Sequence, residues 1–408
     1  MTRHTRDRGR LAQDGGDPVR TTPFAPWPHY DEEQIAAVAD VLRSGKVNYW
    51  TGEDVGAFEQ AFAENLGVAH AIALANGTVA LELALRGLGV GPGDDVVVTC
   101  RSFYASASCV AAVGARPVFA DVDPISQNIT AETIADVLTP HTRAVIPVHL
   151  AGWPCEIDPI LELARDRGLW IVEDCAQAHG AAYRGRPVGA LGHVSAWSFC
   201  QDKIMTTGGE GGLVATNDVD VHRRIWQLKD HGKNPDKLAA PRGPSFKYVH
   251  DAIGTNARLT GPQAAIGRIQ LQRLSDWRAA RAANAARLDE RLGQLDAVWL
   301  LTPPAHLTHA WYKYYCRLRL DRLRTGWTRD GVISALRAEG LPAFSGVCPE
   351  IYNETAFDGL GVRPARALPE ARHLGTDTLM FPVHPTLDLD DMTDIADGVQ
   401  KVLRAAAI

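Results

Sequence analysis

The sequence predicts an α/β fold: a mostly parallel sheet covered by helices on both faces, followed by a smaller C-terminal α/β unit. The 408-residue chain is long enough for one large domain and one small domain. Short apolar runs rich in β-branched residues alternate with stretches of helical apolar spacing, which is typical of buried parallel strands joined by helices. Near residue 266 this alternation gives way to a long helical stretch rich in alanine and arginine.

Helical spacing predicts the first helices over residues 31–44 and 55–66. Seven strand-like runs follow, most of them separated by helical segments, at residues 71–75, 95–99, 115–119, 144–148, 170–173, 196–199 and 212–216. The C-terminal part is predicted to contain a helix over residues 275–295, a strand over 312–318, and helices over 330–339 and 389–404.

The chain divides into three parts. Residues 1–22 mix arginine with aspartate and glycine and contain no apolar segment, so they are expected to form a disordered tail rather than a signal peptide. Residues 23–278 are expected to form the large domain, which contains all seven predicted strands. Residues 279–408 are expected to form the small C-terminal domain.

Composition excludes several classes of protein. A net charge of −6 and a charged fraction of 22% give no electrostatic footprint for nucleic acid. The longest apolar runs, such as residues 144–148, are far shorter than the roughly 18 residues that a membrane helix needs. Seven scattered cysteines without a CxxC pair argue against a structural zinc site. We therefore expect a cytoplasmic protein with reduced thiols and no metal.

The end of the first predicted strand carries a candidate phosphate site. Asn76, Gly77 and Thr78 connect this strand to a helix. Free N–H groups at the positive end of a helix, with a hydroxyl beside them, are suited to bind phosphate. The alternative is an ordinary helix cap.

Two further strand ends carry an acid and a lysine. Asp174 follows an apolar strand, and a buried carboxylate there needs a partner, either a cation of a ligand or an arginine of the chain. Lys203 lies in a short loop between the strand that ends near Ser198 and a glycine cluster. Desolvation or a neighbouring cation lowers a lysine pKa and exposes the lone pair that a Schiff base requires, although Lys203 alone is also consistent with a structural lysine.

Together these three sites match the needs of pyridoxal 5′-phosphate. Gly77, Thr78 and Ser198 would hold the phosphate, Asp174 would keep the pyridine nitrogen protonated, and Lys203 would form the Schiff base.

At this point the sequence resembles the DegT/DnrJ/EryC1/StrS family of pyridoxal-phosphate sugar and cyclitol aminotransferases. The resemblance runs from about residue 23 to near the C-terminus and rests on residues 76–85, 91–95, 173–180, 198–212, 256–260 and 263–265. It implies the aspartate-aminotransferase fold (fold type I), the same roles for Lys203 and Asp174, and a place for Gln177 near the phenolic oxygen of the cofactor. It also implies that Asn256 reaches the phosphate in the neighbouring subunit, hence a homodimer with shared active sites.

The resemblance further implies an aromatic residue over the cofactor ring. Counting back from Gly114 favours Phe103, with Tyr104 as the alternative and as a candidate substrate contact. Arg101 departs from the family pattern, and either contacts substrate or is solvated. His231 and Tyr312 are candidate substrate contacts, with a structural role as the alternative.

The expected reaction moves an amino group from glutamate or glutamine to a keto group of a sugar or cyclitol, which we expect to be linked to a nucleotide. One alternative is a dehydratase or aminodehydratase of the same family that resembles 3-amino-5-hydroxybenzoate synthase. Another is a cofactor-binding regulator without activity. No GxGxxG opens a helix, which disfavours a nicotinamide enzyme.

Overall fold

The structure is a computed structural model that describes residues 9–238 and 249–408. Its centre is a seven-stranded sheet in the order β1-β9-β8-β5-β4-β2-β3. Its strands are β1 His70–Leu74, β2 Asp95–Thr99, β3 Arg116–Ala120, β4 Thr142–Ile146, β5 Trp170–Asp174, β8 Val194–Ser198 and β9 Gly212–Thr216. All run parallel except β9, which is antiparallel to its neighbours β8 and β1. The predicted fold class is confirmed.

Helices cover both faces of this sheet, because alternate side chains of each strand point to opposite sides. On β8, Val194 and Ala196 belong to one buried cluster and Trp197 to another. The first cluster is closed by α3 (Gly77–Gly87) and α4 (Ala105–Ala112), and α7 (Val219–Lys229) packs beside α3. The second is closed by α2 (Asp54–Leu66) and the start of α8 (Gly261–Leu292). The remaining helices of the large unit are α1 (Glu32–Ser44), α5 (Ala131–Ala135) and α6 (Ile157–Arg167).

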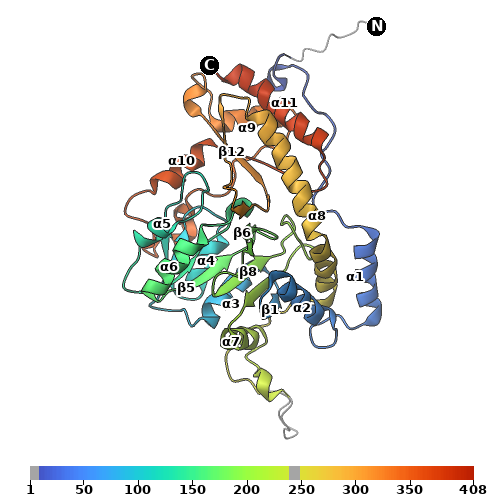
Figure 1. Cartoon of the computed structure of the whole chain (residues 1–408), viewed down its shortest axis with the longest axis vertical. Coiled ribbons are helices and arrows are strands. Elements are labelled where there is room, and N and C mark those ends of the chain that lie inside the picture. Colours follow the sequence, from blue (N-terminus) through green and yellow to red (C-terminus); the bar gives the residue numbers. More distant parts are fainter. Residues whose placement is uncertain (1–8, 239–248) are drawn as a thin grey trace.

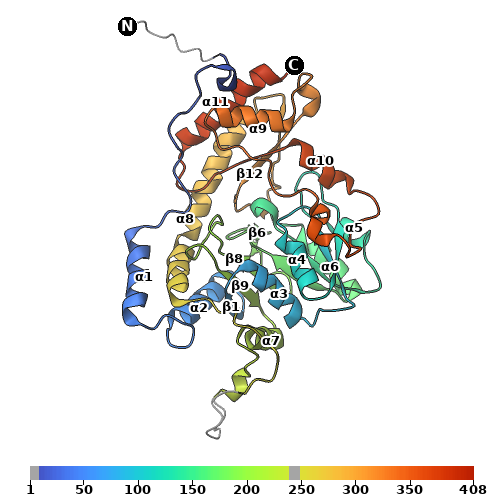
Figure 2. The same ribbon diagram turned by 180° about the vertical axis from the view of Figure 1, so that it is seen from behind.

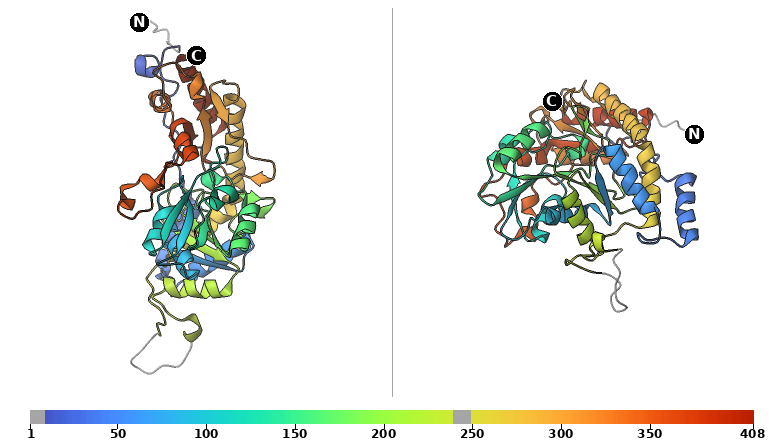
Figure 3. Two further views of the ribbon diagram at one scale, coloured as in Figure 1. Left: turned by 90° about the vertical axis from the view of Figure 1, so that its left-hand side faces the viewer. Right: turned by 60° about the horizontal axis from the view of Figure 1, so that its bottom comes forward.

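The small unit is built on a second sheet, in the order β10-β12-β13. Its strands are β10 Val298–Leu300, β12 Tyr314–Leu318 and β13 Thr378–Phe381, and its helices are α9 Arg329–Ala338, α10 Pro369–Asp377 and α11 Leu389–Ala406. Helix α8 runs from the large unit into the small one (Figures 1 and 2). The proposed boundary between residues 278 and 279 therefore falls inside a continuous helix. The small unit and α7 lie at opposite ends of the molecule (Figure 3).

The expectation that residues 1–22 form a disordered tail is wrong for residues 9–22, which are ordered. Residues 1–8 lie outside the described part of the chain. Leu11 is buried in the core of the small unit. The backbone N–H groups of Ala12 and Val19 donate to the two carboxylate oxygens of Glu339, at 2.8 and 3.0 Å. Arg20 forms ion pairs with two aspartates of α11. Partners far away along the chain thus order a segment whose own composition predicts disorder.

A third, small sheet pairs one short strand near residue 307 with a hairpin that follows β5. Its strands are β11 Leu307–Thr308, β6 Ala182–Tyr183 and β7 Arg186–Pro187, in the order β11-β6-β7. Among the described helices, none combines the length and the apolar character that crossing a lipid bilayer requires.

Candidate active site

Three predicted site segments meet at one edge of the large sheet. β5 and β8 are parallel neighbours, and they end at Asp174 and Ser198. β1 ends at the same edge, where Asn76 leads into α3. A Cβ added to Gly77 would lie 2.6 Å from the Cβ of Ser198, so only glycine allows this close approach. Ligands bind at such carboxyl ends of strands in α/β sheets.

The start of α3 has the features of a phosphate seat. The Asn76 side chain accepts a hydrogen bond from the N–H of Val79 at 2.9 Å and so caps the helix. Within the described chain, the N–H groups of Gly77 and Thr78 donate to no protein acceptor. Two free donors at the positive end of a helix, next to the Ser198 hydroxyl, suit a phosphate group.

Asp174 lies fully inside the protein at the end of β5. Its carboxylate accepts hydrogen bonds from the Ser106 hydroxyl at 2.8 Å and the Ala176 N–H at 3.1 Å. Burial raises the pKa of Asp174, while these hydrogen bonds and the charge of Lys203 oppose the rise. A buried carboxylate is stabilised by a further cationic N–H group, and a protonated pyridine ring would supply one. Neither the residue type nor the spacing of Ser106 in the sequence predicts this contact.

Lys203 occupies the loop after β8 and faces the small unit. Its Nζ lies 3.5 Å from the Tyr312 hydroxyl and 3.8 Å from a carboxylate oxygen of Asp202. Trp27 holds the same loop, since its indole N–H donates to the Lys203 carbonyl at 2.8 Å. The structure thus brings the predicted substrate contact Tyr312 to the predicted catalytic lysine.

Tyr312 and Asp202 form a pair beside this amine. The Tyr312 hydroxyl donates a hydrogen bond to Asp202. Burial alone would raise the pKa of Asp202, but the charge of Lys203 and the Tyr312 hydroxyl lower it overall. Burial raises the pKa of Tyr312 well above its ordinary value, so the hydroxyl keeps its proton. Asp202 therefore stays ionised next to the lysine, and Tyr312 stays a hydrogen-bond donor.

The predicted ring contacts differ in their surroundings. Gln177 is buried, and its side-chain oxygen accepts a hydrogen bond from the Ala151 N–H at 2.7 Å. Phe103 is 64% exposed, in the loop after β2, so its face is available to a ligand. Tyr104 instead packs against Phe357 in the core of the large unit, with ring centroids 5.5 Å apart.

Arg101 is buried and not solvated, which excludes one of its two expected roles. Its side chain donates to Gln127 at 2.9 Å and to Thr378 at 3.2 Å.

The segment that contains Asn256 lies beside the end of β1, where the Ala75 N–H donates to the Ala257 carbonyl at 2.9 Å. Asn256 pairs with Asp230, and the His231 N–H donates to the Thr255 carbonyl at 3.0 Å. In the described ranges, no hydrogen bond connects either residue to Lys203 or Asp174. Both are exposed in the single chain.

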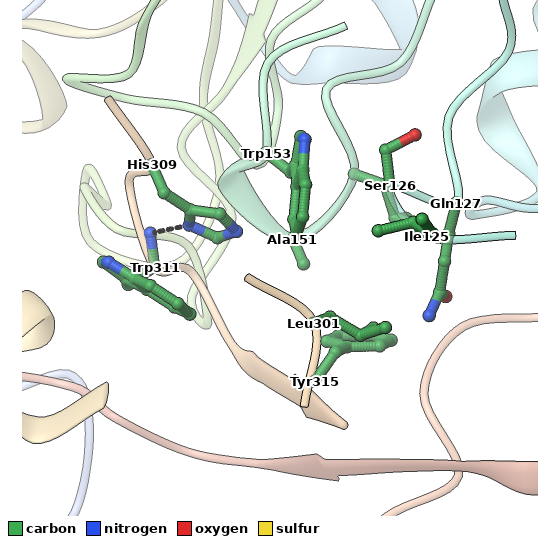
Figure 4. A pocket seen from close by; sticks show the side chains of 10 residues that line it. Ile125, Ser126, Gln127, Ala151, Trp153, Leu301, His309, Trp311 and Tyr315 are labelled. Atoms are coloured by element: carbon green, nitrogen blue, oxygen red, sulfur yellow. Dashed lines mark hydrogen bonds between the residues drawn. The ribbon is translucent and has the colours of Figure 1, made fainter. Parts of the chain in front are cut away.

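A small hollow is lined by residues of both units (Figure 4). Ala151, whose N–H binds Gln177, forms part of its wall. Trp153, His309 and Trp311 surround it, and His309 accepts a hydrogen bond from the Trp311 N–H at 2.8 Å. Burial lowers the pKa of His309 to about 3, so its ring is neutral.

One buried group has the residue types of a metal site: His149, Glu173 and Cys175. Glu173 accepts hydrogen bonds from three N–H groups of residues 189–192 and from the His149 ring. These hydrogen bonds occupy the carboxylate oxygens of Glu173, and they hold the loop between β5 and β8 in place.

A phosphate seat, a buried acid and a lysine at one sheet edge fit pyridoxal phosphate, and the tight Gly77–Ser198 contact provides its cradle. Fold and site together define a pyridoxal-phosphate-dependent aminotransferase of fold type I. The chain belongs to the DegT/DnrJ/EryC1/StrS aminotransferase family, whose pattern it matches over residues 28–400.

Named relatives agree with this assignment. The chain is 39% identical to the GDP-perosamine synthase of Caulobacter vibrioides, over 86% of this chain and 91% of that protein. It is 38% identical to the L-glutamine:2-deoxy-scyllo-inosose aminotransferase of Streptomyces fradiae, over 97% and 98%. The crystal structure of an aminotransferase from Psychrobacter cryohalolentis superposes with a TM-score of 0.91 at 47% identity, covering 94% of this chain and 99% of that one.

Proposed function

We propose that this protein transfers an amino group from glutamate or glutamine to a keto group of a sugar or cyclitol, with a nucleotide-linked sugar as the expected form. The observation that carries the proposal is the placement of Asp174 at the end of β5 and of Lys203 in the loop after β8, the parallel neighbour of β5. Ser198, the last residue of β8, lies against the start of α3 at Gly77. The relatives named above act on sugars and on a cyclitol by their names, and one of them takes glutamine as donor.

Bound pyridoxal phosphate would supply an electron-withdrawing ring that accepts the electrons released at the substrate carbon. The residues of this chain would hold and orient it. Gly77, Thr78 and Ser198 would bind the phosphate, and Asp174 would keep the ring nitrogen protonated through a charge-assisted hydrogen bond. Phe103 would cover one face of the ring, and Gln177 would approach its phenolic oxygen.

Lys203 would carry the cofactor between turnovers and move the proton during them. Once the donor amine has replaced it, the free Nζ is a base that removes the proton from the α-carbon of the donor and later returns it. Tyr312 and Asp202, which lie within 3.5 and 3.8 Å of this nitrogen, would orient it.

Asn256 supports a shared site in a homodimer. It is exposed in the single chain, yet Asp230 beside it is held by Arg258 and Lys233 at 2.8 and 2.9 Å. A polar side chain on a braced, exposed surface is suited to reach into the site of a second copy.

Borohydride reduction of the purified protein tests the assignment. We expect a visible absorption band that disappears on reduction, and a mass adduct on the peptide that contains Lys203. Lys203→Ala should abolish both the band and turnover. A wild-type protein that takes up no pyridoxal phosphate, or a Lys203→Ala variant with an unchanged spectrum and rate, would refute the proposal.

Product mass then separates the two reactions of the family. Transamination of a keto sugar or inosose exchanges an oxygen for an amine, whereas an aminodehydratase also removes water. We expect the simple exchange, with glutamate or glutamine converted to its keto acid.

A further inference from the structure

Arg281, on helix α8, is a buried cation whose guanidinium is only partly hydrogen-bonded within the described residues. Its side chain is 1% exposed, and no carboxylate of the described residues forms an ion pair with it. Nη1 donates to the main-chain carbonyls of Trp311 and Tyr312, at 3.3 and 3.2 Å. Nε and Nη2 donate to no protein atom within the described chain. These two nitrogens form the edge of the guanidinium that binds a carboxylate through two parallel hydrogen bonds.

Arg317 shows how the same protein completes such an edge. It is equally buried, and its Nη1 also donates to a main-chain carbonyl, that of Pro124, at 3.1 Å. Its Nε and Nη2 both donate to the Asp377 carboxylate, at 2.9 and 2.7 Å. Arg281 has the same arrangement without the carboxylate. A buried charge without a partner is costly, so an open edge of this kind points to a ligand that closes it.

Arg281 and Lys203 have two contacting residues in common. Tyr312 contacts both groups, since its carbonyl accepts from Arg281 and its hydroxyl lies 3.5 Å from Lys203 Nζ. Trp27 also contacts both: its ring centroid is 5.2 Å from the Arg281 guanidinium, and its indole N–H donates to the Lys203 carbonyl. Arg281 is therefore within the reach of a small molecule bound at Lys203.

The surroundings have an excess of positive charge. Lys313 is half-buried, and the charges that act on it are those of Asp202, Arg281 and Lys203. Asp202 is thus the acid that acts on Lys313, against the two cations Arg281 and Lys203. Burial lowers the pKa of Lys313 to about 8 and that of Arg281 to about 9. The negative charges of the chain therefore do not offset the cost of burying these two positive charges. An anion at this place would stabilise both.

We propose that Arg281, with Lys313 beside it, binds the α-carboxylate of the amino donor. This inference rests on the proposed function, because an amino acid must present its α-carbon to Lys203. The α-carboxylate is one bond from that carbon, whereas the distal carboxylate of glutamate is absent from glutamine. A planar, two-oxygen anion matches the open Nε–Nη2 edge.

Binding of 2-methyl-L-glutamate to the holoenzyme tests the seat, because this analogue keeps the α-carboxylate but has no α-hydrogen to transfer. Its affinity is read by spectral titration. We expect Arg281→Lys, which keeps the charge and loses the two-pronged edge, to weaken binding roughly 10- to 100-fold. The KM for the keto substrate should stay within about twofold of wild type. Arg317→Lys is the matched control and should leave analogue binding unchanged.

A second measurement does not depend on how well Arg281→Lys folds. For wild-type holoenzyme, kcat/KM for L-glutamate should be at least roughly 100-fold higher than kcat/KM for 4-aminobutanoate, which lacks the α-carboxylate. Lys313→Met should lower this ratio of kcat/KM values severalfold.

Unchanged analogue binding in Arg281→Lys would overturn the proposal. So would a rise confined to the KM of a nucleotide-linked keto sugar, because the edge would then bind the phosphates of that substrate. A wild-type protein that binds the analogue through Arg281 but aminates no ketone would support the seat and refute the proposed function.

Discussion

On the large-unit side of the active site, Gly77, Asp174 and Ser198 lie at the ends of three strands of one sheet, and the chain itself pairs much of their polar surface. On the small-unit side, Arg281 lies on α8 and Tyr312 lies just before β12, and two guanidinium nitrogens of Arg281 have no hydrogen-bond partner among the described residues. In the proposed site, the first side would bind the phosphate and the ring nitrogen of the cofactor. The second side would bind an anion through Arg281 and Lys313.

This difference separates a permanent ligand from a transient one. In the proposed site, a cofactor that stays bound would be held by a helix start, by a buried acid at the sheet edge and by a covalent link to the loop after β8. A substrate that enters and leaves is bound at the junction of two units, where an unpaired arginine makes binding strong only for a matching anion. Changes on the first side should therefore affect cofactor retention, and changes on the second side should affect donor use.

The largest effect is expected for Asp174→Ala. Losing one partner of a buried charge pair costs about 3–5 kcal/mol, so turnover should fall roughly 10²- to 10⁴-fold. Steady-state kinetics with saturating pyridoxal phosphate measure it. Ser106→Ala is the matched control: it removes one hydrogen bond to the same carboxylate and should cost about tenfold or less. Equal losses in the two variants would contradict the role given to the acid.

A smaller effect is expected for Gly77→Ala, confined to cofactor binding. The new methyl group would lie 2.6 Å from the Ser198 Cβ and force the helix start away from it. The Kd for pyridoxal phosphate, measured by absorbance titration, should rise by roughly tenfold or more, since hydrogen bonds to a charged phosphate contribute about 1.5–3 kcal/mol. Gly56→Ala in α2, where nothing lies within 4 Å of the added methyl, should leave this Kd unchanged.

Tyr312→Phe should act on turnover and spare cofactor retention. The variant keeps the ring and loses the hydroxyl that lies between Asp202 and Lys203. We expect kcat to fall about tenfold, the cost of one hydrogen bond to a charged group, with an unchanged Kd for pyridoxal phosphate. A higher Kd for pyridoxal phosphate in this variant would contradict the assignment of cofactor binding to the large-unit side alone.

The smallest effect concerns stability in acid. The pKa of buried His309 is lowered to about 3, so the unfolded chain binds a proton that the folded chain does not between about pH 6.5 and pH 3. Stability contributed by this group is therefore lost as pH falls through that window. Denaturant unfolding should show that His309→Gln loses about 1 kcal/mol less than wild type between pH 6.5 and 5.5. Parallel curves would mean that the His309 ring is already charged in the folded protein.

Much of the large-unit side could be predicted because its features are local. Short β-branched runs predict the seven strands. Asp174 and Ser198 lie at the carboxyl ends of β5 and β8, close to where two of those runs stop. The roles of these residues remain predictions, but their meeting at one edge is what the strand order produces. Ser106 and Asp202 were missed, because neither residue type nor spacing marks them.

The sequence by itself determined the alternation of strands and helices, and with it the sheet edge where glycine, acid and lysine meet, since periodicity and glycine positions are written in short stretches of chain. Only the tertiary structure decided that residues 9–22 are ordered against Glu339, and that Arg281 is buried with an open edge while Arg317 is closed by Asp377. Burial and pairing depend on which distant segments meet, and no local pattern encodes that.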